Sequence, residues 1–337
     1  MTGGILGVGL IGLGEISLIH EAGYNDDQRV KITAVCDLDS SLARSRAEPY
    51  GARHYTDYSE LISDSGVDMV DIALPHRLHY KAAKEALLAG KHVLVEKPMA
   101  MKYREAADLI ATARAKGVKF TVAENTRHVE LYQRAVSIIQ DGRIGRVWNV
   151  RTMIAGSEIT RYSDRRSWVG SKRLGGGIVI DAGVHTFYLF KWAFGGVKYL
   201  RAYNWHQLGT DAEDNSVVIG RLRNGAAFQS QFSDSAQLPW TERLEVYGDK
   251  GVLVGDQLSN PPLKIYAGPM DEDGEAVSGV EYDPMGWKLK SIMNEVKDFA
   301  DAVIEKRDPL VNPYDGAYAV KVAEMVYAGS LELDQIE

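Results

Sequence analysis

The chain has 337 residues, of which 45% are hydrophobic and 25% charged, and its formal net charge at pH 7 is −7. This is the composition of an ordinary globular protein that is long enough for two hydrophobic cores, so two domains are expected. An acidic chain lacks the basic face that nucleic-acid phosphates require, and the sequence has no apolar run of about 18 residues that would span a membrane. Neither a nucleic acid nor a membrane is therefore expected as a partner.

The single cysteine, Cys36, cannot form an internal disulfide bond. It lies in an apolar run typical of a strand, where a small buried thiol is the ordinary interpretation. The chain also starts without the basic leading region of a signal peptide. Both features favour a cytoplasmic protein.

The first third of the chain alternates short β-branched runs with helical patterns. The expected strands are residues 5–11, 31–36, 68–73, 92–95 and 118–123. Alternation of this kind implies right-handed crossovers and a parallel sheet with helices on both faces. We therefore predict a doubly wound α/β domain over residues 1–124.

The first of these strands leads into a glycine-rich turn over residues 12–17, GLGEIS. Glycines here let the backbone approach a pyrophosphate, and the helix that follows directs its amides and positive dipole end at the phosphates. The motif alone is weak, because a short glycine run can mark only a tight turn, and Ser17 stands where a third glycine or alanine is usual. The residues expected to contact a dinucleotide here are Gly12, Gly14, Glu15 and Ile16.

An acidic residue, Asp37, ends the second predicted strand. It follows the glycine turn at close to the offset of about 20 residues at which an acid meets the adenosine ribose in such domains. A carboxylate accepts hydrogen bonds from a free 2′-hydroxyl and repels a 2′-phosphate, and the next residue is Leu38 rather than an arginine. NAD is therefore favoured over NADP as the cofactor, although Arg44 and Arg46 lie near enough in sequence to reach a phosphate.

Two later turns carry polar residues directly after buried strands, where open α/β sheets bind their ligands. The first holds Leu74, Pro75, His76 and His79, and the second holds Glu96, Lys97 and Pro98; all of these except Pro98 are expected to contact the cofactor. Lys97 can place N–H donors near a substrate oxygen, and the alternative is an exposed lysine paired with Glu96. The two histidines can contact the cofactor, and the alternative is that they are helix caps or surface residues.

From residue 125 the pattern changes to that of an α+β domain, which we place over residues 125–337. The expected elements are helices over 131–141, 177–194, 287–304 and 315–330, a strand over 146–154, and hairpins formed by 216–222 with 226–232 and by 243–247 with 252–254. Asn224-Gly225 in the first hairpin is a strong signal for a type I′ turn. A large, mostly antiparallel sheet with helices on one side leaves an open face, and self-association is the simplest cover for it.

The expected helix over 177–194 carries two polar residues, Asp181 and His185, in an apolar sequence. A spacing of four places them on one face of a helix, where they must bond each other, the protein or a ligand. A structural pair is the alternative to a catalytic pair. Gly183 costs about 1 kcal/mol relative to alanine inside a helix, which indicates close packing against its backbone. No metal site is expected, because zinc would need at least three ligands and no further His or Cys cluster is present.

Together these residues resemble the Gfo/Idh/MocA family of NAD(P)-dependent oxidoreductases, which includes glucose-fructose oxidoreductase and inositol 2-dehydrogenase. The resemblance covers essentially the whole chain. Its carriers are Gly12-Leu13-Gly14, Asp37, Leu74-Pro75 with His79, the segment 90–93 that leads to Glu96-Lys97-Pro98, Asn125 with Arg127, and the segments 142–145 and 175–185. The chain departs from the family pattern at His76, where an asparagine is common, and at Val169 after Trp168, where an arginine is often seen.

The resemblance implies a Rossmann domain, a second domain whose open sheet forms homodimers or homotetramers, and hydride transfer at a secondary hydroxyl of a cyclic sugar or polyol. Lys97, Asp181 and His185 match the family's catalytic positions. His185 would then take the hydroxyl proton, Lys97 would hydrogen-bond the reacting oxygen, and Asp181 would orient His185 or bind a neighbouring hydroxyl. Weaker candidates for substrate contacts are Asn125, which can also contact the cofactor, Arg127, Trp168 and Lys172.

Two alternatives use the same fold. Some relatives are glycosidases that retain NAD and oxidise a sugar carbon only transiently, so that no NADH accumulates. The other alternative is a regulator that binds NAD without catalysis, although such a protein has no need of Lys97, Asp181 and His185 together.

Overall fold

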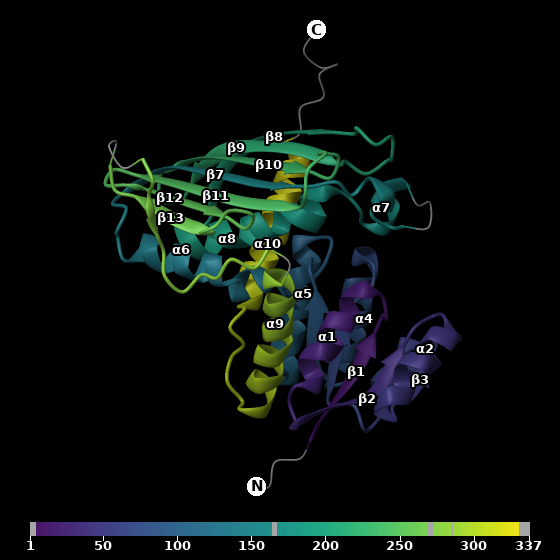
Figure 1. Cartoon of the computed structure of the whole chain (residues 1–337). Coiled ribbons are helices and arrows are strands. Elements are labelled where there is room, and N and C mark those ends of the chain that lie inside the picture. The colour runs from purple at the N-terminus through teal and green to yellow at the C-terminus, as the bar shows by residue number, and fades with distance from the viewer. Residues whose placement is uncertain (1–4, 164–166, 269–271, 285, 330–337) are drawn as a thin grey trace. The chain divides into compact units, whose positions relative to one another are not determined.

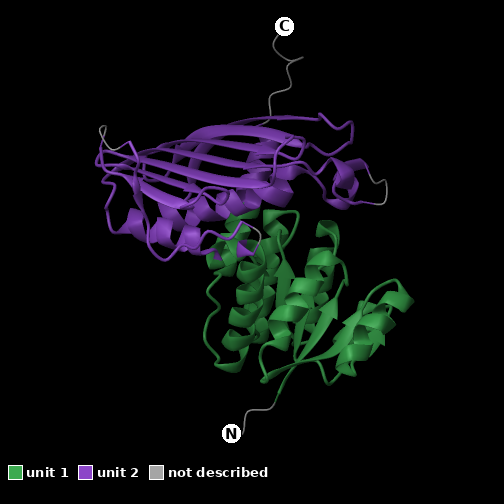
Figure 2. Cartoon of the chain, viewed as in Figure 1, with its two compact units in different colours: residues 1–128, 288–320 green, residues 129–287, 321–337 purple. Residues whose placement is uncertain are grey.

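A computed structural model of the chain describes residues 5–163, 167–268, 272–284 and 286–329. The chain forms two compact units (Figure 2), one of residues 1–128 and 288–320 and the other of residues 129–287 and 321–337. The chain thus leaves the first unit close to the predicted boundary. The prediction that residues 125–337 form a single domain is wrong for residues 288–320, which return to the first unit.

The first unit is built on a parallel sheet (Figure 1). Within the described residues its strands are β1 (Leu6–Ile11), β2 (Val30–Cys36), β3 (Arg53–Tyr55), β4 (Met69–Ile72), β5 (His92–Glu96) and β6 (Phe120–Ala123). Their order, β3-β2-β1-β4-β5-β6, reverses direction between β1 and β4, the point at which doubly wound sheets bind ligands. This confirms the predicted doubly wound fold, and only the short, largely exposed β3 was not expected.

Helices flank this sheet. They are α1 (Glu15–Asn25), α2 (Ser40–Ala47), α3 (Tyr58–Ser63), α4 (His76–Leu88), α5 (Tyr103–Lys116) and α9 (Trp287–Ile304), with short 3-10 turns η1 (Glu48–Tyr50) and η2 (Asn125–His128). The buried residues Val296, Phe299 and Ala300 of α9 pack in the same core as Leu10 of β1 and Tyr24 of α1. This apolar contact is the physical reason why the late segment belongs to the first unit.

Cys36 is buried, as predicted, at the end of β2. Burial, with a smaller contribution from the charge of Asp37, raises the pKa of the Cys36 thiol to about 12, so the thiol stays protonated near neutral pH. Among the helices in the described part of the chain, none has the length and apolar character needed to cross a membrane.

The second unit contains a large sheet with the strand order β14-β13-β12-β11-β7-β10-β9-β8 over the described residues. The strands are β7 (Val147–Ala155), β8 (Val197–Trp205), β9 (Asn215–Leu222), β10 (Ala227–Ser233), β11 (Thr241–Gly248), β12 (Val252–Asp256), β13 (Leu263–Tyr266) and β14 (Glu275–Ala276). The pair β7 and β10 is parallel and the other described pairs are antiparallel. The sheet is therefore mostly antiparallel, as predicted.

Figure 1 shows helices α6 and α8 along one face of this sheet. The helical elements outside the first unit's set are α6 (Glu130–Gln140), α7 (Ile159–Ser163), η3 (Lys172–Leu174), the π-helical turn η4 (Val179–Gly183), α8 (Val184–Phe194) and α10 (Pro313–Ala328). Helix α10 begins in the first unit and ends in the second. Ser330, the last residue of the helix expected there, lies outside the described residues.

Both predicted hairpins are present, as β9 with β10 and β11 with β12. The turn in the first one differs from the expected type I′, because Gly225 has a positive φ of 93° whereas Asn224 is not among the residues with positive φ. The Gly225 N–H donates to the Leu222 carbonyl over 3.1 Å. This is a type I turn followed by a left-handed glycine, the usual three-residue hairpin loop.

The sheet face opposite α6 and α8 carries exposed apolar and aromatic side chains. Cross-strand pairing places Tyr203 beside Val217 and Arg201 beside Ile219. Tyr199, Tyr203, Val217 and Ile219 are exposed hydrophobic residues. We refer to Tyr199, Arg201, Tyr203, Val217 and Ile219 as the open face.

Phe299 tests the position of α9, because its side chain is completely buried whereas Leu289 on the same helix is 48% exposed. Phe299→Ala is expected to lower the free energy of unfolding by about 3–5 kcal/mol through the lost burial and the cavity left behind. Leu289→Ala is the matched control and should change it by less than about 0.5 kcal/mol. Urea unfolding followed by circular dichroism measures both, and equal small losses would contradict the packing of α9 in this core.

Candidate active site

The glycine turn between β1 and α1 leaves room for an anion. Gly12 has a φ of +89°, and a Cβ there would lie 2.5 Å from the Ala73 carbonyl oxygen, so only glycine is accommodated. A Cβ at Gly14 would meet no described atom within 4 Å, and Gly14 caps α1 without a side-chain hydrogen bond. Gly14 thus places no side chain over the first amides of α1, and such a helix N-terminus fits a diphosphate.

Asp37 is held beside this turn by backbone donors. Its Oδ2 accepts the Leu13 N–H over 3.0 Å and its Oδ1 accepts the Asp39 N–H over 3.0 Å. The following residue, Leu38, is 90% exposed. The carboxylate thus has a fixed place at the end of β2, which is the position expected of an acid that meets a ribose.

Arg46 of α2 also forms hydrogen bonds with this turn. Its guanidinium donates to the Leu13 carbonyl over 3.2 Å and to Ser17 Oγ over 3.1 Å, and it forms an ion pair with Glu21. Ser17 Oγ in turn donates to the Gly14 carbonyl over 2.7 Å. The possibility that Arg46 reaches toward a 2′-phosphate is therefore disfavoured, because its donors already support the turn; Arg44 is exposed.

A buried histidine joins the two polar turns that follow β4 and β5. His79 has no exposed surface, and its ring nitrogens lie 2.8 Å from the Pro98 carbonyl oxygen and 2.6 Å from the Leu74 carbonyl oxygen. Burial lowers the pKa of His79, against the opposing effect of the two carbonyl oxygens. Because His79 is buried, the surface alternative is wrong, and its predicted contact with a cofactor stays a prediction.

His76, the first residue of α4, is also buried, and its ring packs edge-on against His79 with a centroid distance of 5.7 Å. The interpretation of His76 as a surface residue is therefore wrong as well. Leu74 and Pro75, which precede it, are half-buried. Their predicted contacts with a cofactor stay predictions.

Lys97 follows directly on the last residue of β5. The buried Glu96 carboxylate accepts the Lys97 N–H over 3.0 Å. Lys97 itself is half-buried, so the alternative of an exposed lysine is wrong. The backbone of the turn is thus fixed on one side by Glu96 and on the other by His79.

Asn125 and Arg127 lie in η2, after β6. The Asn125 amide donates to Ser291 Oγ of α9 over 3.0 Å, so its orientation depends on the late segment that joins this unit. Both Asn125 and Arg127 are half-buried. Their predicted contacts with cofactor and substrate stay predictions.

In the second unit, Asp181 and His185 share one side of a nearly continuous helix. The segment starts with the π-helical turn η4, which contains Asp181, and continues as α8, whose second residue is His185. Between residues 175 and 190 these two residues are half-buried and all the others are buried. This burial pattern agrees with the predicted shared face, which stays a prediction, and π-helical turns are frequent at functional sites.

The glycine run before this helix is explained by close packing. A Cβ at Gly176 would lie 1.9 Å from the Val169 carbonyl oxygen, and one at Gly177 would lie 2.4 Å from Glu213 Oε1. The same Glu213 oxygen accepts the Val179 N–H over 3.3 Å at the start of the helix. The close contact expected at Gly183 is wrong, because a Cβ there would come no nearer than 3.4 Å to its neighbours, an ordinary distance.

Two residues near Asp181 carry no motif and were not anticipated. Tyr162 Oη donates to Asp234 Oδ2 over 2.8 Å, and both side chains are buried. Burial, and then the negative charge of Asp181, raise the pKa of Asp234 to about 7. Perturbed carboxyl groups of this kind gather at functional sites.

Two predicted substrate contacts lie in the loop before the helix. Trp168 is half-buried, and Lys172 is exposed in η3, where its N–H donates to Asp211 Oδ1 over 3.0 Å. The structure thus places Trp168, Lys172, Asp181 and His185 in the second unit and the glycine turn, Asp37 and Lys97 in the first. Each unit holds one part of the predicted site.

Comparison with known proteins identifies both units. The model of an oxidoreductase family with an NAD-binding Rossmann fold matches residues 6–124, and the model of the GFO/IDH/MocA C-terminal domain matches residues 132–254. The chain is 30% identical to trans-1,2-dihydrobenzene-1,2-diol dehydrogenase of Bos taurus, over 77% of this chain and 74% of that protein. It is 25% identical to myo-inositol 2-dehydrogenase of Thermotoga maritima, over 97% of this chain and 96% of that one.

A solved structure of levoglucosan dehydrogenase in complex with NADH and levoglucosan has the same fold, with a TM-score of 0.83 and 23% identity over 96% of this chain and 97% of that chain. The first family model makes residues 6–124 an NAD-binding Rossmann domain, and the open glycine turn fits this cofactor.

The carboxylate of Asp37 is expected to set the preference between NAD and NADP. Asp37→Ala removes the negative charge that repels a 2′-phosphate, so the ratio of the Kd for NADPH to the Kd for NADH should fall by about tenfold or more. Fluorescence titration with each nucleotide measures this ratio. Asp39→Ala, which removes the exposed N-cap of α2, is the control and should leave the ratio unchanged. A wild-type protein that prefers NADPH would contradict this role of Asp37.

Proposed function

Because the chain belongs to the Gfo/Idh/MocA family of NAD-binding oxidoreductases, we propose that it is an NAD-dependent dehydrogenase acting on a secondary hydroxyl of a cyclic sugar or polyol, such as an inositol. The observation that carries the proposal is the pair Asp181 and His185, an acid and an imidazole that are half-buried whereas the other residues between 175 and 190 are buried. The similar proteins that act on myo-inositol and levoglucosan support the substrate class.

NAD supplies the hydride acceptor when it is bound. Gly12, Gly14 and the first turn of α1, with Glu15 and Ile16, would hold its diphosphate, and Asp37 would hold its adenosine ribose. The open space at Gly14 supports this assignment. Leu74, Pro75 and Asn125 are proposed as further contacts of the cofactor.

The protein's own groups would manage the proton and the developing charge. His185 would accept the hydroxyl proton, since an imidazole exchanges protons efficiently near neutral pH. Asp181, on the same side of the helix, would orient that ring or bind a neighbouring hydroxyl. Lys97 would donate a hydrogen bond to the reacting oxygen and so stabilise negative charge on it. Arg127, Trp168 and Lys172 are proposed to contact the substrate.

Removing the proposed base or the lysine tests these roles. His185→Ala and Lys97→Ala are each expected to lower kcat/KM by about 10²- to 10⁴-fold while leaving the Kd for NADH within about threefold. The assay follows NADH absorbance with a panel of aldoses, inositols, deoxysugars and glycosides. His54→Ala changes an exposed histidine of β3 and serves as the control. Full turnover by either of the first two variants would contradict the assignment.

The same assay separates the proposed reaction from its alternatives. A dehydrogenase forms NADH in proportion to the oxidised product. A glycosidase that retains NAD releases a sugar from a glycoside without accumulation of NADH. A protein that binds NADH and turns over no compound of the panel would support the regulator.

We also propose that the open face mediates a homodimer or homotetramer. An exposed surface that combines Tyr199, Tyr203, Val217 and Ile219 with Arg201 has the aromatic and arginine content typical of protein interfaces. A closed symmetric assembly buries such a face against its own copy.

A charge placed on the open face is expected to disrupt this assembly. Ile219→Arg puts a cation in the middle of the apolar patch, so the molar mass in solution should fall to that of a smaller species. Light scattering coupled to size-exclusion chromatography measures the mass. Leu258→Arg, at an exposed leucine away from this face, is the control. A wild-type protein that is monomeric at micromolar concentration would contradict the proposed assembly.

A further inference from the structure

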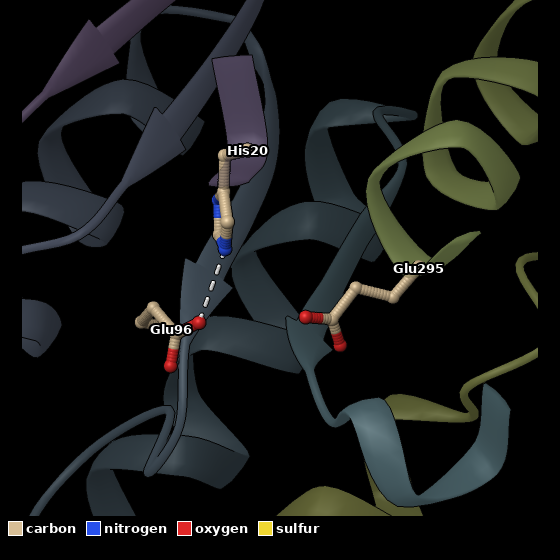
Figure 3. Close-up of side chains that lie close together, drawn as sticks. All are labelled: His20, Glu96 and Glu295. Atoms are coloured by element: carbon tan, nitrogen blue, oxygen red, sulfur yellow. Dashed lines mark hydrogen bonds and ion pairs between the residues drawn. The ribbon is translucent and has the colours of Figure 1, made fainter. Parts of the chain in front are cut away.

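A cluster of buried ionisable side chains lies under the turn that carries Lys97. His20 of α1, Glu96 of β5 and Glu295 of α9 are all buried, and one nitrogen or oxygen of each lies within 4.8 Å of those of the other two. Figure 3 shows the Glu295 carboxyl group directed toward Glu96. The proposed function assigns no role to these groups.

Hydrogen bonds link the cluster to the backbone of Lys97. Tyr24 Oη donates to Asp71 Oδ2 over 2.7 Å, and the same oxygen lies 2.8 Å from His20 Nδ1. His20 Nε2 lies 3.2 Å from Glu96 Oε1 (Figure 3). The other Glu96 oxygen, Oε2, accepts the Lys97 N–H over 3.0 Å. One imidazole thus connects a buried aspartate of β4 to the carboxylate that holds the turn.

The charges of the side chains stabilise this series of hydrogen bonds. Burial alone would lower the pKa of His20, but the carboxylates of Asp71 and Glu96 raise it well above its ordinary value, so both ring nitrogens carry protons and donate. Burial likewise opposes ionisation of Glu96, yet the bond from His20, with the charges of His20, Lys97 and His79, keeps its pKa below the ordinary value. The cation at His20 therefore keeps Glu96 ionised and able to accept.

The pKa of Glu295 is shifted in the opposite direction to that of Glu96. Burial, and then the negative charge of Glu96, raise the pKa of Glu295 well above its ordinary value against the opposing charge of His20. Its Oε2 is buried and has no hydrogen-bond partner among the described residues. A protonated carboxyl group in this place tolerates burial, whereas an ionised one would not.

We propose that His20 is a positioning residue for Lys97: held by Asp71, it fixes the Glu96 carboxylate in the orientation in which its second oxygen accepts the Lys97 amide. The proposal rests on the function proposed for Lys97 only where it concerns turnover. A carboxylate side chain without its buried donor can rotate or take up a proton, and either change removes the bond to the turn. An error of about 1 Å in the place of a catalytic group can cost about 100-fold in rate.

Two substitutions at one position separate the two bonds of His20. The amide nitrogen of asparagine lies close to the place of Nδ1, so His20→Asn can keep the bond to Asp71 while losing the bond to Glu96. The amide nitrogen of glutamine reaches the place of Nε2, so His20→Gln can keep a donor to Glu96. If the bond to Glu96 is what matters, the asparagine variant is the more damaged of the two.

The main measurement does not depend on enzymatic activity. Hydrogen–deuterium exchange, with overlapping peptides that isolate the Lys97 amide, reports directly whether Glu96 accepts that N–H. We expect exchange of this amide to be about tenfold faster or more in His20→Asn and close to wild type in His20→Gln. Tyr24→Phe is a milder change, because it removes only the hydrogen bond from Tyr24 to Asp71. It should increase the exchange rate of the Lys97 amide by a smaller factor, and it keeps the test available if His20→Asn fails to fold.

Turnover provides the second measurement. We expect kcat of His20→Asn to fall about 10- to 100-fold with the Kd for NADH within about threefold. A faster Lys97 amide without any measurable turnover in the wild type would mean that the proposed dehydrogenase is wrong and the positioning role is right. An unchanged Lys97 amide in His20→Asn, whatever happens to kcat, would overturn the positioning role.

Glu295→Gln is the matched control, because an amide mimics a protonated carboxyl group. A carboxyl group whose pKa is raised on folding contributes stability that is lost as pH rises from the unfolded value toward the folded one. Glutamine cannot ionise, so the Tm of this variant should equal or exceed that of wild type at pH 8, and its Lys97 amide should exchange as in wild type.

A divalent cation is the competing occupant of the cluster, because a histidine held by an aspartate beside two glutamates is also a metal-ligand arrangement. Such an ion would require His20 Nε2 to lose its proton. Stoichiometric metal in the purified protein by mass spectrometry, with a fall in Tm for Glu295→Gln or on addition of a chelator, would replace the positioning role with a metal site.

Discussion

The site in the first unit depends on side chains that bond the backbone of the turns at the carboxyl ends of parallel strands. Asp37 accepts the Leu13 amide, His79 joins the carbonyls of two turns, and Glu96 accepts the Lys97 amide. A sheet alone fixes the strands but leaves the turns beyond their ends without partners. Hydrogen bonds that involve a charged group contribute about 1.5–3 kcal/mol each, which is enough to hold a short turn in one conformation.

The second unit holds its helical segment by hydrogen bonds to Glu213 together with close packing. Glu213 accepts the first amides of the helical segment, and the absence of side chains at Gly176 and Gly177 lets the backbone come close enough for this. Between residues 175 and 190 every residue except Asp181 and His185 is buried. Support of this kind would suit the catalytic role proposed for Asp181 and His185, because catalysis gains from groups that are in place before a ligand arrives.

The predictable parts of the structure are those encoded in neighbouring residues. Apolar runs identified every strand of the parallel sheet except β3, whose three residues lack such a run, and the spacing of Asp181 and His185 indicated their shared face. The return of α9 to the first unit was not predictable, since its apolar stripe matches any core and only contacts with Leu10 and Tyr24 identify the right one. The type of turn at Asn224 was missed for a different reason: the same two residues suit both turn types, and loop length decides between them.

Long-range polar pairs escape local patterns entirely. His20 is separated from Asp71 by 51 residues and from Glu96 by 76, and Tyr162 from Asp234 by 72. Each of these residues, taken alone, looks like a surface residue of its helix or strand. What brings His20 to Asp71 and Glu96 is the strand order, in which β1, β4 and β5 are neighbours.

The cluster around His20 offers a reason for the presence of buried charges in the core of the first unit. Replacing a buried ion pair by apolar residues of similar volume is often neutral or stabilising by about 1–4 kcal/mol, so stability alone gives no reason for this arrangement. An apolar core in the same place would pack as well, but it offers no acceptor for the Lys97 amide. A histidine between two carboxylates does what apolar side chains cannot, because it fixes the direction of Glu96 by two bonds from opposite sides of one rigid ring. The cost of burying these charges is therefore explained by the need to hold one lysine in one place.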